Sequence, residues 1–242
     1  MTVHIGTSGW SYDHWTGVLY PEGLPARERL ARYVQAFGTA ELNASFYRWP
    51  RDVSFASWRA RTPEGFVLSV KAPRGLTHGK RLYAPERWAH RIAGAWHELG
   101  ETRGVLLVQL GPGQERDDAR LGYFLEKLPW WVRVAVELRH PSWHDEGVFR
   151  LLEHHGAAYC VMSGAQLPCV LRATAPFVYV RLHGPDDHHL YGGSYGEDSL
   201  RWWADRVGEW EAGGREVFVY FNNDGDGNAV RNAGRLREIL GR

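Results

Sequence analysis

Short runs of apolar and β-branched residues recur along the chain, and most are followed by a segment of helical periodicity. This alternation is typical of repeated βα units and a parallel sheet. We expect strands at 3–9, 39–47, 66–73, 104–111, 132–140, 157–164, 177–184 and 216–223. Helices are expected at 26–37, 52–61, 85–99, 116–127, 145–155, 198–210 and 227–240, so that only the sixth strand has no helix after it. Eight strands with interleaved helices predict an α/β fold, a single (β/α)₈ TIM barrel with a parallel eight-stranded sheet.

Composition predicts the number of domains and the cellular environment of the protein. The 242 residues contain no Gly/Ser-rich linker, which predicts one domain over 1–242. A formal net charge of +1 removes overall basicity as an argument for nucleic-acid binding. The two cysteines, Cys160 and Cys169, have no metal or redox spacing. The start "MTVHIGTSGW" lacks the pattern of a signal peptide and no apolar run is long enough to span a membrane, so we expect a cytoplasmic protein without membrane contact.

Polar side chains gather at the end of nearly every expected strand. In a TIM barrel the functional site lies at the C-terminal ends of the strands, so these residues are the candidates. On the second strand, Glu41, Asn43 and Ser45 alternate at period two, which predicts that they share one face. The candidate site residues are Trp10, Glu41, Asn43, Tyr47, Lys71, Glu137, Arg139, Arg181, His183, Asn222 and Asn223.

Three of these candidates, Lys71, Arg139 and Arg181, are cations that would converge on one barrel mouth. Cations in a partly dry cleft favour an anion such as a phosphate or carboxylate. The alternative is that they pair with Glu41 and Glu137 in a buried ionic lattice that only supports the barrel.

Proton transfer would fall to Glu41, Glu137 and His183, because carboxylates and imidazole are the usual general acids and bases. For His183 the alternative is a hydrogen-bonded histidine at a strand end. Asn43, Asn222 and Asn223 can both donate and accept hydrogen bonds, as sugar hydroxyls or base edges require, but asparagine also favours turns. Trp10, Trp15, Tyr47 and Trp143 are candidates for stacking, with core packing as the alternative.

Two stretches of the chain contain candidate metal ligands. "YFNNDGDGNA" (220–229) has EF-hand-like oxygen spacing from Asp224, but Ala229 and Arg235 stand where calcium loops need Gly and Glu. "HGPDDHH" (183–189) has no helical H-x-x-x-H spacing. We therefore expect no metal ligands and no cofactor, with a divalent metal on mixed N/O ligands as the alternative.

Seven blocks in order, "GTSGWSYDHWTGVLYP", "ELNASFY", "VKAPRGLTH", "LLVQL", "VELRHPSW", "YVRLHG" and "YFNND…NAVRNAGRL", resemble the DUF72 (YecE-like) family over nearly the whole chain. The resemblance implies a TIM barrel related to xylose-isomerase-like and endonuclease-IV-like barrels, and it implies no particular activity. "QLGPG" replaces the family's usual "QLPP" after the fourth strand, which concerns only the shape of that loop.

The expected function is that of an isomerase-type or hydrolase-type enzyme on a small anionic polar ligand, such as a sugar or sugar phosphate. One alternative is a nucleic-acid-binding or endonuclease-IV-like repair protein, and another is a barrel that binds a ligand without catalysis. The sequence determines neither the substrate nor the oligomeric state.

Overall fold

A computed structural model describes residues 2–242, and its parallel strands form a closed barrel in the order β1 to β8. The strands are β1 (Val3–Ser8), β2 (Thr39–Leu42), β3 (Val67–Lys71), β4 (Arg103–Leu110), β5 (Val134–Leu138), β6 (Ala158–Ser163), β7 (Phe177–Leu182) and β8 (Glu216–Phe221). The helices are α1 (Arg29–Ala36), α2 (Ala44–Tyr47), α3 (Asp52–Arg61), α4 (Glu86–Leu99), α5 (Asp118–Lys127), α6 (Glu146–His154), α7 (Glu197–Ala212) and α8 (Asn228–Ile239). The predicted (β/α)₈ barrel is confirmed.

Most expected elements are present, with ends shifted by a few residues. Each of the expected helices corresponds to one of α1 and α3 to α8, and the described residues 164–176 between β6 and β7 contain no helix, as expected. Asp117 and Asp145 show why two helices begin where they do, since their carboxylates accept hydrogen bonds from first-turn backbone N–H groups. Across residues 2–242, none of the helices is both long and apolar enough to span a membrane.

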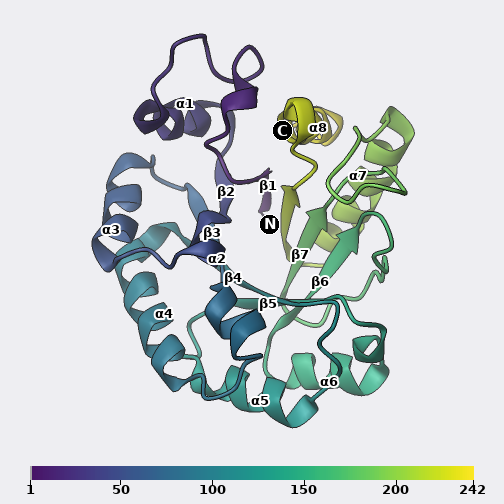
Figure 1. Cartoon of the computed structure of the whole chain (residues 1–242). Helices are drawn as coiled ribbons and strands as arrows, with labels where there is room; N and C mark the ends of the chain where they lie inside the picture. Colours follow the sequence, from purple (N-terminus) through teal and green to yellow (C-terminus); the bar gives the residue numbers. More distant parts are fainter. Residues whose placement is uncertain (1) are drawn as a thin grey trace. The chain divides into compact units, whose positions relative to one another are not determined.

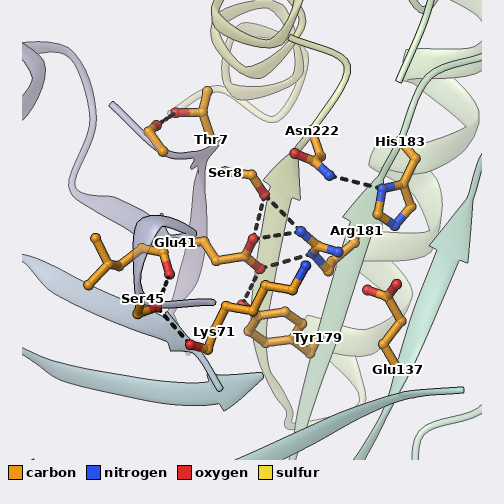
Figure 2. A network of polar contacts seen from close by, with 12 residues as sticks. Thr7, Ser8, Glu41, Ser45, Lys71, Glu137, Tyr179, Arg181, His183 and Asn222 are labelled. Atoms are coloured by element: carbon orange, nitrogen blue, oxygen red, sulfur yellow. Dashed lines mark hydrogen bonds and ion pairs between the residues drawn. The ribbon is translucent and has the colours of Figure 1, made fainter. Parts of the chain in front are cut away.

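The expectation of one strand over 39–47 is wrong. The strand ends at Leu42, and the chain then turns into the four-residue helix α2. The hydroxyl of Ser45 donates to the carbonyls of Leu42 and Lys71, at 2.8 and 2.7 Å, and fixes this turn (Figure 2). Hydrogen bonding to the backbone overrides the period-two pattern here, so Asn43 and Ser45 do not continue the face on which Glu41 lies.

The described chain divides into two compact units. The first comprises Met1–Glu41, Val161–Leu171 and Pro176–Arg242. In it β8 pairs with both β1 and β7, and α7 and α8 pack against each other and against β8 (Figure 1). The β1–β2 register sets Ser8 opposite Glu41. The strand residues 217–221 are wholly buried, as expected for a parallel sheet covered on both faces.

The second unit comprises Leu42–Cys160 and Arg172–Ala175. Its strands β3, β4 and β5 pair side by side, and α3 packs against α4 while α5 packs against α6 (Figure 1). Residues 105–108 of β4 have no exposed surface, and the β4–β5 register sets Gln109 opposite Glu137. Both polar residues therefore lie near the carboxyl ends of their strands. The expected single domain over 1–242 stays a prediction.

Candidate functional site

The most connected polar group of the first unit is the carboxylate of Glu41. It accepts hydrogen bonds from the Ser8 hydroxyl at 2.5 Å and the Tyr179 hydroxyl at 2.7 Å (Figure 2). Arg181 binds both carboxylate oxygens, with Nε at 3.0 Å and Nη2 at 2.8 Å. Glu41 and Arg181 are fully buried. The pair is the bidentate arrangement that matches guanidinium to carboxylate geometry.

This environment fixes the charge state of the carboxylate. Burial raises the pKa of Glu41, but the Arg181 charge and the hydrogen bonds from Arg181, Ser8 and Tyr179 outweigh burial and lower the pKa below its usual 4.5. Burial, and then the Glu41 charge, raise the pKa of the Tyr179 phenol well above its usual value. Glu41 is thus ionised with its oxygens engaged, which favours a role in holding Arg181 over the predicted role as proton carrier.

His183 lies just beyond the end of β7, where its backbone N–H donates to the Ser163 carbonyl at 2.7 Å. Its Nδ1 is 3.1 Å from the amide nitrogen of Asn222, as Figure 2 shows. Because an amide nitrogen only donates, Nδ1 accepts and the neutral ring carries its proton on Nε2. The structure therefore brings together two predicted site residues, His183 and Asn222, in one unit with Glu41 and Arg181.

Asn223 has a different role from its neighbour. Its amide donates to the Gly193 carbonyl at 3.0 Å and to the Asn232 side chain at 2.8 Å, while the Asn232 oxygen also accepts from the Tyr195 backbone at 3.0 Å. These bonds tie the loop before α7 to β8 and α8. Its amide donors are engaged in the fold, whereas its buried side-chain oxygen has no hydrogen-bond partner, so the expected ligand contact at Asn223 stays a prediction.

The second unit holds the remaining charged candidates, Lys71, Glu137 and Arg139. Arg139 Nε donates to Glu137 Oε1 at 2.6 Å, and Glu137 is fully buried. The Lys71 ammonium lies 4.3 Å from the centre of the Phe46 ring, a cation–π contact. The side-chain oxygen of Gln109 is buried without a hydrogen-bond partner, so a polar ligand group could satisfy it.

His78 completes this cluster, and sequence reasoning did not single it out. It belongs to a five-residue π-helix, Gly75–Gly79, directly after β3, and its ring meets Phe46 edge-on at 5.1 Å. Burial, and then the charges of Lys71, Arg74 and Arg139, lower the pKa of His78 below its usual 6.5, while Glu137 opposes them. One feature of the sequence could have pointed to His78: it is the last residue of the block "VKAPRGLTH", which carries part of the family resemblance.

The predicted arginines have carboxylate partners in both units. Arg181 pairs with Glu41 and Arg139 with Glu137, as the alternative of internal pairing anticipated. Lys71 and Arg139 act on the same histidine, so these two cations lie in one cluster. The convergence of all three cations on one anion stays a prediction.

The remaining candidates lie apart from these charges or within the core. Trp10 is half-buried, and its carbonyl accepts a hydrogen bond from the Tyr20 hydroxyl. Asn43 precedes α2, and its buried side-chain oxygen has no partner. Tyr47 is 82% exposed. Trp15 and Trp143 are core residues whose indole N–H groups donate to Asp224 and to the Gln114 carbonyl, which makes them packing residues.

Neither of the candidate metal-binding stretches, 183–189 and 220–229, holds a cluster of metal ligands among the described residues. Within residues 2–242 no group of three or more His, Cys, Asp or Glu side chains is placed to hold a metal ion. Asp186 instead accepts from the backbone of His188 and His189, at 2.8 and 2.9 Å. Asp224 accepts from Trp15 at 2.7 Å. These carboxylates stabilise their own loops.

Comparison with known proteins gives a consistent match. The family model described as "Protein of unknown function DUF72" matches residues 4–242. The UPF0759 protein YunF of Bacillus subtilis is 27% identical over 275 residues, spanning 98% of this chain and 94% of that protein. A DUF72 family protein from Thermotoga maritima has a crystal structure that superposes with a TM-score of 0.88 at 29% identity, covering 100% of both chains. Another from Enterococcus faecalis, at 20% identity and a TM-score of 0.86, covers 100% of this chain and 96% of its own and shares the fold.

Proposed function

Because the chain belongs to the DUF72 family, whose description carries no activity, we propose a function from the charged cluster itself: an enzyme that acts on a small anionic polar molecule such as a sugar phosphate. Lys71 and Arg139 would hold the anion at the carboxyl ends of β3 and β5. His78 and Glu137 would move protons in an isomerase-type or hydrolase-type reaction.

The observation that carries this proposal is the charge balance around His78. Three cations, Lys71, Arg74 and Arg139, and one carboxylate, Glu137, act on this half-buried imidazole. An anion entering such a cluster would be attracted by these cations, and in a partly dry site that attraction is little screened. Burial, and then these cations, lower the pKa of His78 below its usual 6.5, which favours the neutral ring that can accept a proton from a substrate.

Binding of an anion and protonation of His78 are therefore linked. A negative charge beside the imidazole raises its pKa, because it offsets the surrounding cations. Anion binding should then take up protons, and affinity should increase as the pH falls through the raised pKa of the complex. A basic surface patch far from His78 could also attract anions, but it would not link anion binding to protonation of this histidine.

The first test uses inorganic phosphate and ribose 5-phosphate as probes. NMR titration of the histidine rings, with the His78 signal assigned by its loss in His78→Gln, should show a higher His78 pKa with phosphate than without it. Lys71→Gln should weaken binding of both probes by about tenfold in calorimetry, since it removes a charge-assisted contact. Lys80→Gln is the matched control, because Lys80 is an exposed lysine of the following segment.

Equal affinity in the Lys71→Gln and Lys80→Gln proteins, both folded by circular dichroism, would contradict the proposed binding site. Catalysis is tested separately on sugar phosphates in deuterated water. Isomerisation would appear as deuterium incorporation or a new sugar signal, and hydrolysis as released phosphate. Either activity should be lost in Glu137→Gln or His78→Gln. Turnover that survives both substitutions would remove these residues from the mechanism.

A further inference from the structure

A hollow lies in the second unit, outside the charged cluster, where α2 is joined to α3. It measures about 340 Å³ and lies within the range of small-ligand pockets. We call it the α2–α3 hollow; Arg48, Trp49, Arg51, Ser54 and Trp58 line it. Nothing in the proposed function uses these residues.

The rim of the α2–α3 hollow is positively charged. Arg48 and Arg51 are exposed, and neither guanidinium has a carboxylate within ion-pair distance among the described residues. Arg51 also precedes α3, a ten-residue helix whose first turn is capped by no side chain. The positive end of the helix dipole therefore adds to the two arginines.

The acidic residue at this helix end is directed elsewhere. Asp52 does not line the hollow, and its carboxylate faces Gly94 of α4, where an added Cβ would lie 3.5 Å from Asp52 Oδ2. No other acidic side chain is among the lining residues. The hollow thus combines two arginines with the positive end of the α3 dipole, which suits a phosphate group.

The wall of the hollow is aromatic. Trp49 is 8% exposed, and its buried indole N–H has no hydrogen-bond partner. The Trp49 ring lies 5.5 Å from Phe55, which meets Trp58 edge-on at 5.3 Å. A buried donor without an acceptor is costly, and a ligand oxygen in the hollow could accept from it. Trp58 also lines the hollow, and it is half-buried, so a ligand in the hollow would lie beside its ring.

We propose that the α2–α3 hollow binds a phosphate group attached to a flat aromatic ring, the chemistry of a nucleotide. The phosphate would contact Arg48, Arg51 and the first turn of α3, and the base would stack on Trp58. Arginine and an aromatic face together are the groups that bind nucleotides without reading their sequence. The ligand could be a free nucleotide or one unit of a single-stranded nucleic acid, since both present the same groups.

The test measures binding of adenosine 5′-monophosphate, adenosine and a dT8 oligonucleotide to the full chain by calorimetry at low salt. Arg48→Ala/Arg51→Ala should weaken binding of the monophosphate by about tenfold or more and leave adenosine binding nearly unchanged. Trp58→Leu should weaken all three ligands, and Trp58→Phe should restore most of the affinity because stacking is retained. Arg87→Ala/Arg150→Ala, which removes the same charge at exposed positions outside the hollow, is the control.

Tighter binding of dT8 than of the monophosphate would identify single-stranded nucleic acid as the source of the nucleotide, and the reverse would identify a free nucleotide; both support the site. The proposal is overturned if the monophosphate does not bind, or if the Arg48/Arg51 and control variants bind it equally. Lys71→Gln should leave monophosphate binding in the hollow intact. The inference and the proposed function therefore fail independently.

Discussion

The ion pair between Glu41 and Arg181 is fully buried and fully hydrogen-bonded on the carboxylate side. Removing one charge from such a pair strands the other away from water, which costs more than the pair itself contributes. The same reasoning explains why Ser8 and Tyr179 surround the carboxylate: each supplies a donor that replaces a lost water molecule.

We expect Glu41→Gln to lower the free energy of unfolding by about 3–5 kcal/mol, because the buried Arg181 guanidinium loses the charged carboxylate that binds its Nε and Nη2. Urea unfolding followed by circular dichroism measures the change. Glu209→Gln is the control; Glu209 pairs with Arg206 on the exposed side of α7, where screening by water leaves little to lose.

The double variant Glu41→Gln/Arg181→Met should lose less stability than the sum of the two single variants, since it removes both charges. A loss equal to that sum would show that the two side chains are not coupled. Such additive losses of stability in the two single variants would also mean that groups other than Glu41 stabilise Arg181.

Residue type alone identified most members of the charged clusters, because charged side chains at strand ends are few and costly to bury. Residue type did not reveal which cation pairs with which carboxylate. Arg181 lies 140 positions from Glu41 in the chain, and only the barrel brings them together. His78 was missed because a lone histidine after a strand has no distinctive spacing. Its cationic neighbours come from the end of β3, from the residue before the π-helix and from the residue after β5.

At the scale of elements, β1 approaches β2 so closely that only glycine fits at one position. A Cβ added to Gly6 would lie 2.3 Å from the backbone oxygen of Thr39. That contact is with backbone, so it can be relieved only by moving a strand. Gly38, two residues after the end of α1, has nothing within 4 Å of an added Cβ and no positive φ.

Gly6→Ala should therefore destabilise the protein by about 1–3 kcal/mol or more, as overpacking of a core does. Gly38→Ala should stabilise it by up to about 1 kcal/mol, because alanine restricts the unfolded chain more than glycine. Thermal and urea unfolding of the two variants against the parent chain decides the matter. If the two substitutions have equal effects, the close approach of β1 to β2 is not as described.

Secondary structure was predictable wherever the apolar period and the element length agreed. The strand and helix positions along the chain follow from that pattern alone, as does the connection without a helix before β7. The segment 39–47 misled because its polar residues alternate like those of a strand, whereas Ser45 forms hydrogen bonds with two carbonyls and closes a turn. Short segments are decided by such local competition.

At the scale of the whole molecule, three histidines make stability depend on pH. Burial is the first cause that lowers the pKa of His78, His144 and His155 below the usual 6.5. In the unfolded chain these groups take up protons as the pH falls through about 6.5, while in the folded protein they resist protonation. The unfolded state then binds more protons, so stability is complete above pH 6.5 and is lost progressively below it.

We expect the free energy of unfolding to fall between pH 7.5 and 5.5, measured from urea unfolding curves at fixed ionic strength. His144→Gln/His155→Gln should flatten this dependence, because glutamine does not titrate. The comparison uses the slope with pH, since each substitution also changes stability at every pH. Stability that is constant or rises towards pH 5.5 would show that these histidines are not held neutral by the fold.

The sequence by itself determined the βα rhythm, the closed barrel that follows from it and the set of polar residues at the strand ends, because these depend on local periodicity and on the general geometry of parallel strands. Tertiary structure decided which charges neutralise each other, as between Glu41 and Arg181, and which charges lie close enough to act on His78. It also brought Arg48, Arg51 and Trp58 to one hollow. Electrostatic pairing depends on distances of a few ångströms between residues remote in sequence, and only the folded chain sets those distances.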